Sequence, residues 1–304
     1  MAKIRIKKQS YVFDFMQHVI EQLQQLGRIR CSESYTATLN SFKRFRNQKD
    51  VLLSEMDSEM MQAYEAYLKD KGLCPNSSSF YLRNLRAVYN RAVEKKLVKQ
   101  QFPFKHVYTG IDKTVKRAIP LQTIKAIKNM DFSTDSSLDF ARDMFLFSFY
   151  TRGMSFIDMA YLEKKNLKNG ILTYRRRKTG KQLIIKFEKC MQELVEKYDI
   201  PQSPYLLPII QPSSSKTERE QYLYAAHHIN RHLKSIGTLL GISIPLTLYV
   251  ARHSWASIAK CQRIPLSVIS EGMGHESERM TLIYLATLDT VAVDKANRTI
   301  LRLL

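Results

Sequence analysis

Residues 252–285, RHSWASIAKCQRIPLSVISEGMGHESERMTLIYL, predict helices on both sides of a glycine-containing turn. The short helix IPLSVISEG has Pro265 near its start and Gly272 at its end, which are the favoured places for these two residues. The turn MGH follows, and the next helix carries Tyr284, nine residues after His275. Taken alone, this pattern resembles a helix-turn-helix, and that signal is weak.

The residues just upstream place three polar side chains together. Tyr249, Arg252 and His253 are spaced i, i+3 and i+4, so on a helix they share one face. Trp255 and Ile258 point elsewhere, as residues that anchor a helix in a core do. An arginine, two histidines and a tyrosine within about thirty residues are consistent either with DNA reading or with chemistry on DNA.

Composition favours a folded protein with a polyanionic partner. The 304 residues are enough for two domains, and 44% of them are hydrophobic, which argues against global disorder. The net charge is +20, and the basic excess is spread over both halves of the chain rather than collected in a tail. Nucleic acid is therefore the expected partner, against the plainer alternative of a basic surface without such a ligand.

Cysteine usage and hydropathy exclude several other classes. The cysteines are far apart and form no C-x-x-C pair, so neither zinc nor a disulfide framework is expected, and a reducing cytoplasm fits; they are Cys31, Cys74, Cys190 and Cys261. No apolar run reaches the roughly 18 residues of a membrane span. The N-terminal MAKIRIKKQS is basic but lacks the apolar stretch of a signal peptide.

The first hundred residues predict a bundle of helices. The last of them, residues 76–96, carries apolar residues at helical spacing with three arginines interleaved. The apolar stripe is core. The arginines are candidate DNA-binding residues, against the alternative of a solvated face; they are Arg83, Arg86 and Arg91.

A linker and a second domain follow. Residues 105–117 are rich in turn formers and lack periodicity, which divides the chain into domains 1–104 and 118–304. In the second domain, residues 136–154 are apolar nearly all round and predict a buried central helix. Residues 170–187, GILTYRRRKTGKQLIIKF, predict a β-hairpin around Thr179-Gly180.

The segments RHSWA, MGHES and TLIYL together resemble the tyrosine recombinase, or phage integrase, family. That family has an H-x-x-R-H box, then L-G-H, then a nucleophilic tyrosine nine residues after the last histidine. The resemblance implies a mainly α fold. It consists of a helical, SAM-like core-binding domain and a mixed α+β catalytic domain with a small three-stranded antiparallel sheet.

The resemblance also implies an activity and roles for single residues. It implies a site-specific DNA recombinase that works through a 3′-phosphotyrosyl intermediate without ATP, metal or other cofactor. Tyr284 matches the nucleophile, Arg252 the second catalytic arginine, and His275 the position that helps bind the phosphate. Lys178 matches the hairpin lysine that protonates the leaving oxygen. Lys181 is the nearby alternative and a candidate DNA contact.

The chain departs from the family pattern at two positions. Tyr249 replaces the first histidine of the H-x-x-R box, and a phenol is a poor proton shuttle at neutral pH. This puts the general base in doubt, with His253 as a possible assistant. In RGMSFIDMAYL, residues 152–162, Ser155 stands where the family has its first catalytic arginine.

Two arginines are candidates to replace the missing one. Arg152 precedes Ser155 by three residues, so one helical turn brings it to the same place, although it is also suited to cap the preceding helix. Arg176 precedes Lys178 by two residues, hence on the same face of a strand, and this argument slightly favours it. Asp158 is expected to orient an arginine.

The resemblance further implies partners and a setting. These are double-stranded DNA with an inverted-repeat core site, and a homotetramer on two such sites, without a membrane, on the nucleoid in a bacterial cytoplasm. Few residues precede the first helix, so no arm-binding domain is expected, which favours DNA inversion over mobile-element integration or excision. The amphipathic residues 285–304 match a helix that docks on a neighbouring protomer in the family, and otherwise predict a helix packed on its own domain.

Two rival functions remain open from the sequence. A helix-turn-helix regulator would bind DNA through residues 252–285 without catalysis. A type IB topoisomerase-like enzyme shares the tyrosine chemistry but does not bring two sites together.

Overall fold

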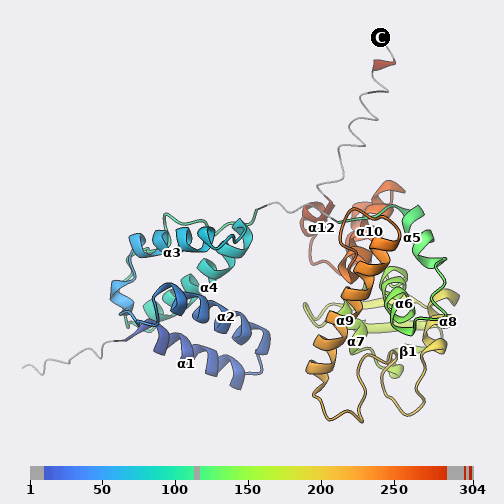
Figure 1. The fold of residues 1–304 in the computed structure, drawn as a ribbon, viewed down its shortest axis with the longest axis horizontal. Helices are drawn as coiled ribbons and strands as arrows, with labels where there is room; N and C mark the ends of the chain where they lie inside the picture. Colours follow the sequence, from blue (N-terminus) through green and yellow to red (C-terminus); the bar gives the residue numbers. More distant parts are fainter. Residues whose placement is uncertain (1–9, 113–116, 286–297, 299–300, 303–304) are drawn as a thin grey trace, which may run out of the picture. The chain divides into compact units, whose positions relative to one another are not determined.

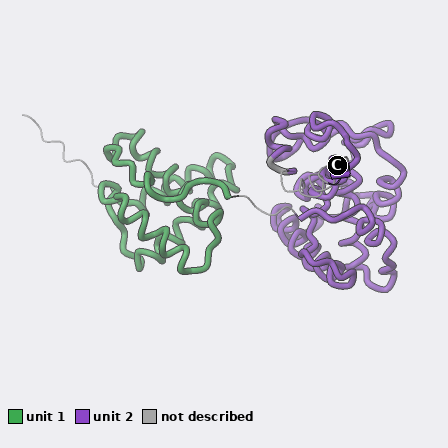
Figure 2. Tube along the Cα trace, turned by 90° about the horizontal axis from the view of Figure 1, so that it is seen from above, with its two compact units in different colours: residues 1–114 green, residues 115–304 purple. Residues whose placement is uncertain are grey.

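The computed structural model describes residues 10–112, 117–285, 298 and 301–302, except for the side chains of residues 283 and 284. The chain divides into two compact units, residues 1–114 and 115–304 (Figure 2). The predicted C-terminal helix of residues 285–304 lies almost wholly outside the described residues. None of the helices in the described ranges is long and apolar enough to cross a membrane.

Unit 1 is a bundle of helices around one hydrophobic core (Figure 1). Its elements are α1 (Val12–Gln25), α2 (Ile29–Phe45), the short 3-10 helix η1 (Leu53–Glu55), α3 (Ser58–Asp70) and α4 (Pro75–Glu94). Asp57 caps α3 by accepting a hydrogen bond from the backbone N–H of Met60. Tyr64 of α3 is fully buried against Phe42 of α2, and its hydroxyl donates to Ser41 at 2.8 Å. These contacts lock α3 onto α2.

The segment after α4 packs back onto unit 1. Val107 is buried in the core, Ser79 donates to the carbonyl of Gly110 at 2.6 Å, and the Asn76 amide pairs with the backbone of Asp112. Residues 113–116 of the predicted linker lie outside the described residues. The domain boundaries expected from the sequence stay a prediction.

Unit 2 is built around the buried helix α6 (Ser136–Tyr150), which contacts α5, α8, α9 and α10. Its other helices are α5 (Leu121–Lys128), α7 (Phe156–Ala160), the 3-10 helix η2 (Lys164–Asn166), α8 (Lys189–Lys197), α9 (Glu218–Leu239), α10 (Leu248–Cys261), α11 (Leu266–Gly272) and α12 (Glu278–Leu285). The central helix expected from residues 136–154 is thus present.

A small antiparallel sheet completes unit 2. It consists of β1 (Leu167–Lys168), β2 (Ile171–Arg175) and β3 (Gln182–Lys186) in the order β1-β2-β3. In β2 and β3 alternate residues are buried, because the sheet packs one face on the core: Leu172 and Tyr174 of β2, and Leu183 and Ile185 of β3. The mainly α fold with a three-stranded antiparallel sheet is therefore confirmed.

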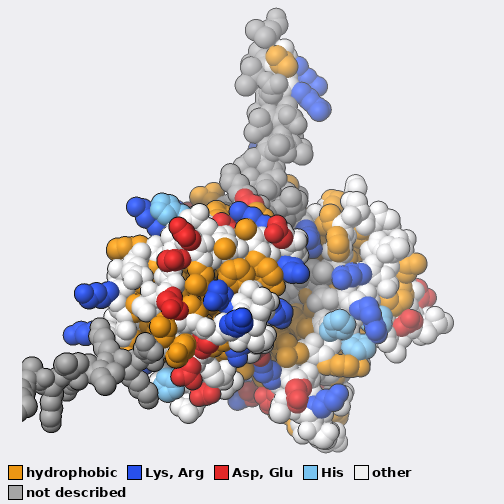
Figure 3. Space-filling view, turned by 60° about the vertical axis from the view of Figure 1, so that its left-hand side comes forward, with side chains coloured by type: hydrophobic (Ala, Val, Ile, Leu, Met, Phe, Trp, Pro, Cys, Tyr) orange, Lys and Arg blue, Asp and Glu red, His pale blue; other side chains and the backbone are white. Residues whose placement is uncertain are grey.

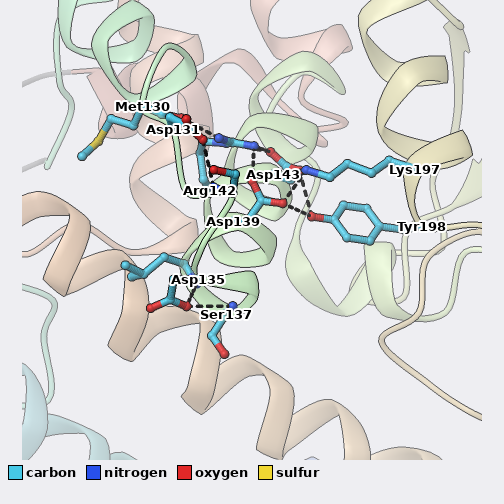
Figure 4. A network of polar contacts seen from close by, with 11 residues as sticks. Met130, Asp131, Asp135, Ser137, Asp139, Arg142, Asp143, Lys197 and Tyr198 are labelled. Atoms are coloured by element: carbon cyan, nitrogen blue, oxygen red, sulfur yellow. Dashed lines mark hydrogen bonds and ion pairs between the residues drawn. The ribbon is translucent and has the colours of Figure 1, made fainter.

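A network of charges joins α6 to α8 (Figure 4). Asp143 is buried on α6 and accepts hydrogen bonds from Arg142, from Lys197 at 2.7 Å and from the Tyr198 hydroxyl at 2.8 Å. Asp139 shares both cations. Because each buried carboxylate oxygen of Asp143 has partners, the burial of this charge is compensated.

Candidate active site

Arg252 is held in the interior of unit 2 by backbone carbonyls. It lies on α10, is 6% exposed, and donates from Nη1 to the carbonyl of Gly153 at 2.7 Å and from Nη2 to that of Met273 at 2.8 Å. Nη2 also lies 3.0 Å from Nε2 of His275. A guanidinium has only donors, so Nε2 is the acceptor in this contact. Three segments, the turn after α6, α10 and the turn after α11, therefore meet at one cation.

The turn between α6 and α7 is shaped for the close approach of α10. Gly153 has φ +73°, and a Cβ atom at this position would lie 2.7 Å from the Cα of Arg252. Glycine is required on both counts, because other residues are strained at this φ and would clash with the α10 backbone. Gly153 thus brings its carbonyl within reach of Arg252.

His275 lies in the turn between α11 and α12 and is buried. Its Nδ1 is 2.7 Å from Oγ1 of Thr281 in α12. Because Nε2 accepts from Arg252, Nδ1 carries the proton and donates to Thr281. Burial lowers the pKa of His275 to about 4, and the positive charges of Arg252 and other nearby cations contribute to this shift. The imidazole is therefore neutral at physiological pH.

Arg176 reaches the same turn from the hairpin. It is 8% exposed, and its Nη1 donates to the carbonyl of Gly274 at 2.6 Å. Gly274 has φ +64°, and a Cβ there would lie 2.8 Å from Cδ of Arg176. The argument from strand period is nevertheless wrong, because β2 ends at Arg175 and both Arg176 and Lys178 lie in the loop, one buried and the other exposed.

Arg152 does not take the place of the missing arginine by one helical turn. It follows the end of α6 with φ +62°, so no continuous helix joins it to Ser155. Its side chain donates to the carbonyl of Ile184 in β3 at 3.3 Å and lines an open groove of about 660 Å³ with Trp255 and Glu271. Of the two candidates, Arg176 and not Arg152 therefore contacts the turn carrying His275.

The two hairpin lysines differ in their surroundings. Lys178 is exposed at the tip of the loop between β2 and β3. Lys181 forms an ion pair with Glu271 of α11 at 2.7 Å and lies 3.3 Å from the carbonyl of His275. Both lysines are close enough to His275 to lower its pKa. The hairpin thus brings its positive charge to the site.

Asp158 does not orient an arginine side chain, in contrast to the expectation. It is 4% exposed on α7, and its carboxylate accepts from the Ser155 hydroxyl at 2.6 Å and from the backbone N–H of Arg177 at 2.8 Å. Its contact with residue 177 is therefore with the main chain of the loop between β2 and β3. Asp158 therefore fixes the hairpin loop.

A cleft opens beside Arg252. It has a volume of about 350 Å³ and is lined by α7, α9 and α10, with Ser155, Tyr249 and Arg252 among the polar side chains. Tyr249 is 58% exposed, and its ring meets that of the buried His253 edge-on at 4.5 Å. The three residues predicted to share one face of a helix are thus brought together.

Tyr284 belongs to α12, the helix that begins just after His275. Its side chain lies outside the described part of the structure. The helix is anchored by two buried residues, Thr281 one turn before the tyrosine and Leu285 directly after it. The hydrogen bond between His275 and Thr281 therefore holds α12, the helix that carries Tyr284, next to His275.

Sequence reasoning missed Thr281 and the carbonyls of Gly153, Met273 and Gly274. The signal for Thr281 was a single polar residue in the apolar run TLIYL, one helical turn before Tyr284. The carbonyls carried no signal, because backbone atoms do not depend on residue type.

The candidate DNA-binding arginines of α4 are engaged within unit 1. The Nε of Arg83 contacts the Ser79 carbonyl at 3.4 Å, Arg86 donates to Thr109 at 2.8 Å, and the guanidinium of Arg91 lies 5.5 Å from the centre of the Tyr35 ring. On the face of unit 1 turned toward the viewer in Figure 3, Lys and Arg side chains are interspersed with acidic and apolar ones.

Comparison with known proteins gives the family. Residues 11–107 match the phage integrase SAM-like domain and residues 121–290 match the phage integrase family. No curated protein sequence matches significantly. Among the described residues, no three His, Cys, Asp or Glu side chains lie close enough to hold a metal ion.

Solved structures of recombinases share the fold. A lambda integrase dimer bound to a COC′ core site has a TM-score of 0.71 at 13% identity, covering 94% of this chain and 80% of that one. The Tn1549 transposon integrase in complex with a circular intermediate DNA has a TM-score of 0.65 at 14% identity, covering 94% and 99%. XerH recombinase bound to a palindromic difH substrate has a TM-score of 0.67 at 14% identity, covering 93% and 83%. With both of its units matched, the chain belongs to the phage integrase family and is a tyrosine-type site-specific recombinase.

Proposed function

We propose that this recombinase breaks DNA by attack of the Tyr284 hydroxyl on a backbone phosphorus, which leaves the 3′ end joined to the enzyme by a phosphotyrosyl bond. The observation that carries the proposal is the buried Arg252–His275 pair: Arg252 lines a cleft, and His275 is linked through Thr281 to the helix of Tyr284. The phosphorane formed during attack gains negative charge, and a guanidinium in a water-poor site stabilises it strongly.

Cleavage requires two proton transfers, one to the leaving 5′-oxygen and one from the attacking phenol. As the bond from Tyr284 to phosphorus forms, the bond from phosphorus to the 5′-oxygen breaks, and this oxygen takes a proton from the ammonium of Lys178. The phenolic proton of Tyr284 goes to a base. Tyr249 is a poor base at neutral pH, so we assign this proton to His253, whose ring adjoins that of Tyr249.

Rejoining reverses these steps with a different strand. The 5′-hydroxyl of the partner strand attacks the phosphotyrosyl bond, and Tyr284 leaves with a proton. Because the energy of the phosphodiester is kept in the covalent intermediate, no ATP is consumed. Arg252 and Arg176 supply the two positive side chains that the phosphate needs, with Arg176 in place of the family arginine that Ser155 replaces.

The proposed substrate is double-stranded DNA with an inverted-repeat core site, bound by a homotetramer on two such sites. A lambda integrase tetramer bound to a Holliday junction shares the fold, which supports this assembly. We assign Arg83, Arg86, Arg91 and Lys181 to the DNA backbone. Inversion is the favoured outcome, with mobile-element integration or excision as the alternative, on nucleoid DNA in a bacterial cytoplasm.

A nicked suicide substrate carrying the recombination site tests the proposal. Loss of the short fragment beyond the nick traps the 3′-phosphotyrosyl complex, which remains as a slow band under denaturing conditions. We expect Tyr284→Phe to abolish this band and to leave DNA binding intact. A regulator without catalysis gives only noncovalent shifts of the DNA band, which disappear when salt is added. A topoisomerase forms the covalent band and relaxes supercoils but joins no strands from two sites.

A further inference from the structure

The loop between β2 and β3 is closed by main-chain hydrogen bonds. The N–H of Arg176 donates to the carbonyl of Lys181 at 2.9 Å, and the N–H of Gly180 donates to the carbonyl of Arg176 at 2.8 Å. Lys178 lies within this closed turn. The direction in which its side chain leaves the loop therefore depends on how the turn as a whole is held.

One side of the loop is attached to α7 at Arg177. Its N–H donates to the buried carboxylate of Asp158, and its guanidinium carbon lies 3.8 Å from the centre of the Tyr161 ring. That distance is short for a cation over a ring. The Tyr161 ring in turn lies against Tyr222, which stacks on Phe156 of α7. The guanidinium therefore rests on a packed aromatic surface.

The other side of the loop is attached to α11 at Lys181, through Glu271 and the carbonyl of His275. Three residues, 178–180, remain between the two attachments. An exposed lysine has four rotatable bonds, and its reach to one phosphate oxygen depends on where its Cα is fixed. Two attachments on either side of Lys178 fix its Cα.

We propose that Arg177, resting on Tyr161, is a positioning residue that holds Lys178 where its ammonium reaches the leaving 5′-oxygen. This inference rests on the proposed role of Lys178 as the general acid. In this role Arg177 and Tyr161 act through Lys178 rather than on the reacting atoms. Loss of the aromatic surface removes one of the two contacts on the α7 side of the loop and leaves the hydrogen bond to Asp158, so proton delivery slows without being abolished.

A pair of suicide substrates separates this role from a general defect. One has the natural 5′-oxygen at the scissile phosphate and the other a bridging 5′-sulfur. A thiolate is stable near neutral pH and leaves without a proton, so cleavage of the sulfur substrate does not need the acid. In Tyr161→Leu we expect cleavage of the oxygen substrate to slow by roughly 10-fold, a part of what general acid catalysis supplies. Cleavage of the sulfur substrate stays near the wild-type rate.

Matched variants control for side-chain loss. Tyr161→Phe keeps the ring under Arg177 and is expected to restore the rate with the oxygen substrate. Tyr224→Leu removes a comparable pair on α9, where Lys216 lies 5.0 Å from the ring centre, and leaves both rates unchanged. Arg177→Gln provides a second test in case Tyr161→Leu unfolds.

The outcomes distinguish this inference from the proposed function. If Tyr161→Leu and Arg177→Gln slow both substrates equally, or slow neither, the inference is overturned. If both substrates are cleaved equally slowly and DNA binding becomes less dependent on salt, Arg177 contacts a DNA phosphate instead. Lys178→Ala tests the general acid separately. If the sulfur substrate does not restore cleavage by Lys178→Ala, or restores cleavage by Lys181→Ala instead, Lys178 is not the general acid. The inference about Arg177 is then overturned as well.

Discussion

The Oγ1 of Thr281 lies 2.7 Å from Nδ1 of His275, and this contact joins the histidine of the site to the helix that carries Tyr284. Both side chains are buried. Since Arg252 has only donors and contacts the opposite ring nitrogen, Nδ1 carries the proton and donates it to Thr281. Arg252 thus sets the tautomer of the ring, and the Thr281 hydroxyl holds its orientation.

Thr281→Val keeps the shape of the side chain and removes the acceptor. We expect the rate of covalent complex formation to fall by roughly 10-fold, because a buried hydrogen bond of about 1–2 kcal/mol is lost. Thr281→Ser retains the oxygen and should keep most of the rate. Equal rates for the valine and serine variants would show that the hydroxyl does not act on His275.

The lowered pKa of His275 predicts a pH dependence of stability. The unfolded chain has the ordinary histidine pKa near 6.5, and the folded protein has about 4. Below pH 6.5 the unfolded state binds the proton first, so the free energy of unfolding falls as pH drops toward 4 and is unaffected above 6.5. Between pH 7 and pH 5 we expect a loss of at most about 2 kcal/mol from this residue.

Urea unfolding of the wild type and of His275→Gln at both pH values isolates this contribution. The glutamine variant is expected to lose less stability over the interval, since other groups titrate in both proteins. An identical loss in the two proteins contradicts a lowered pKa at His275.

Gly153 offers a test of how Arg252 is held. Gly153→Ala places a methyl group 2.7 Å from the Cα of Arg252 at φ +73°, so it should lower both stability and cleavage. Gly241→Ala is the matched control, because Gly241 has φ +61° but nothing within 4 Å of a Cβ. The control should cost about 1 kcal/mol, the strain of a left-handed backbone alone. Thermal unfolding of both variants gives the difference, and a loss at Gly153 no larger than at Gly241 would show that the turn moves freely.

The sequence predicted elements well where one local pattern determines them. The hairpin was recognisable from two β-rich runs around Thr179-Gly180, and α11 from Pro265 and Gly272 at its ends. Helix α2, by contrast, begins at Ile29 without a side-chain cap, so no capping residue in the sequence marks this end.

The site was harder to predict because its contacts are mostly between side chains and distant backbone. Strand period favours Arg176, yet β2 ends one residue before it, and its contact with the Gly274 carbonyl depends on a turn ninety-eight residues away. Asp158 was assigned to an arginine side chain but binds the main chain of Arg177. Neither partner follows from residue types or spacing.

The α6–α8 network predicts a large loss of stability from one carboxylate. Asp143→Ala leaves Arg142 and Lys197 with Asp139 as their shared carboxylate, so we expect a loss of about 1.5–3 kcal/mol, the range for hydrogen bonds to a charged group. Glu193→Ala is the control, since its i, i+4 pair with Lys189 is exposed and worth about 0.5 kcal/mol or less. Chemical denaturation of both variants measures the difference; similar losses contradict a coupled network.

Arg176, rather than Arg152, is expected to replace the arginine that the family carries at the position of Ser155. Arg176 donates to the carbonyl of Gly274, next to His275, whereas Arg152 donates to β3. Arg176→Ala should therefore lower covalent complex formation by roughly 100-fold or more, the scale of losing one donor to a developing charge. Arg152→Ala should keep cleavage within a few-fold of wild type. The reverse order in the suicide-substrate assay would move the missing positive charge to Arg152 and remove Arg176 from the proposed mechanism.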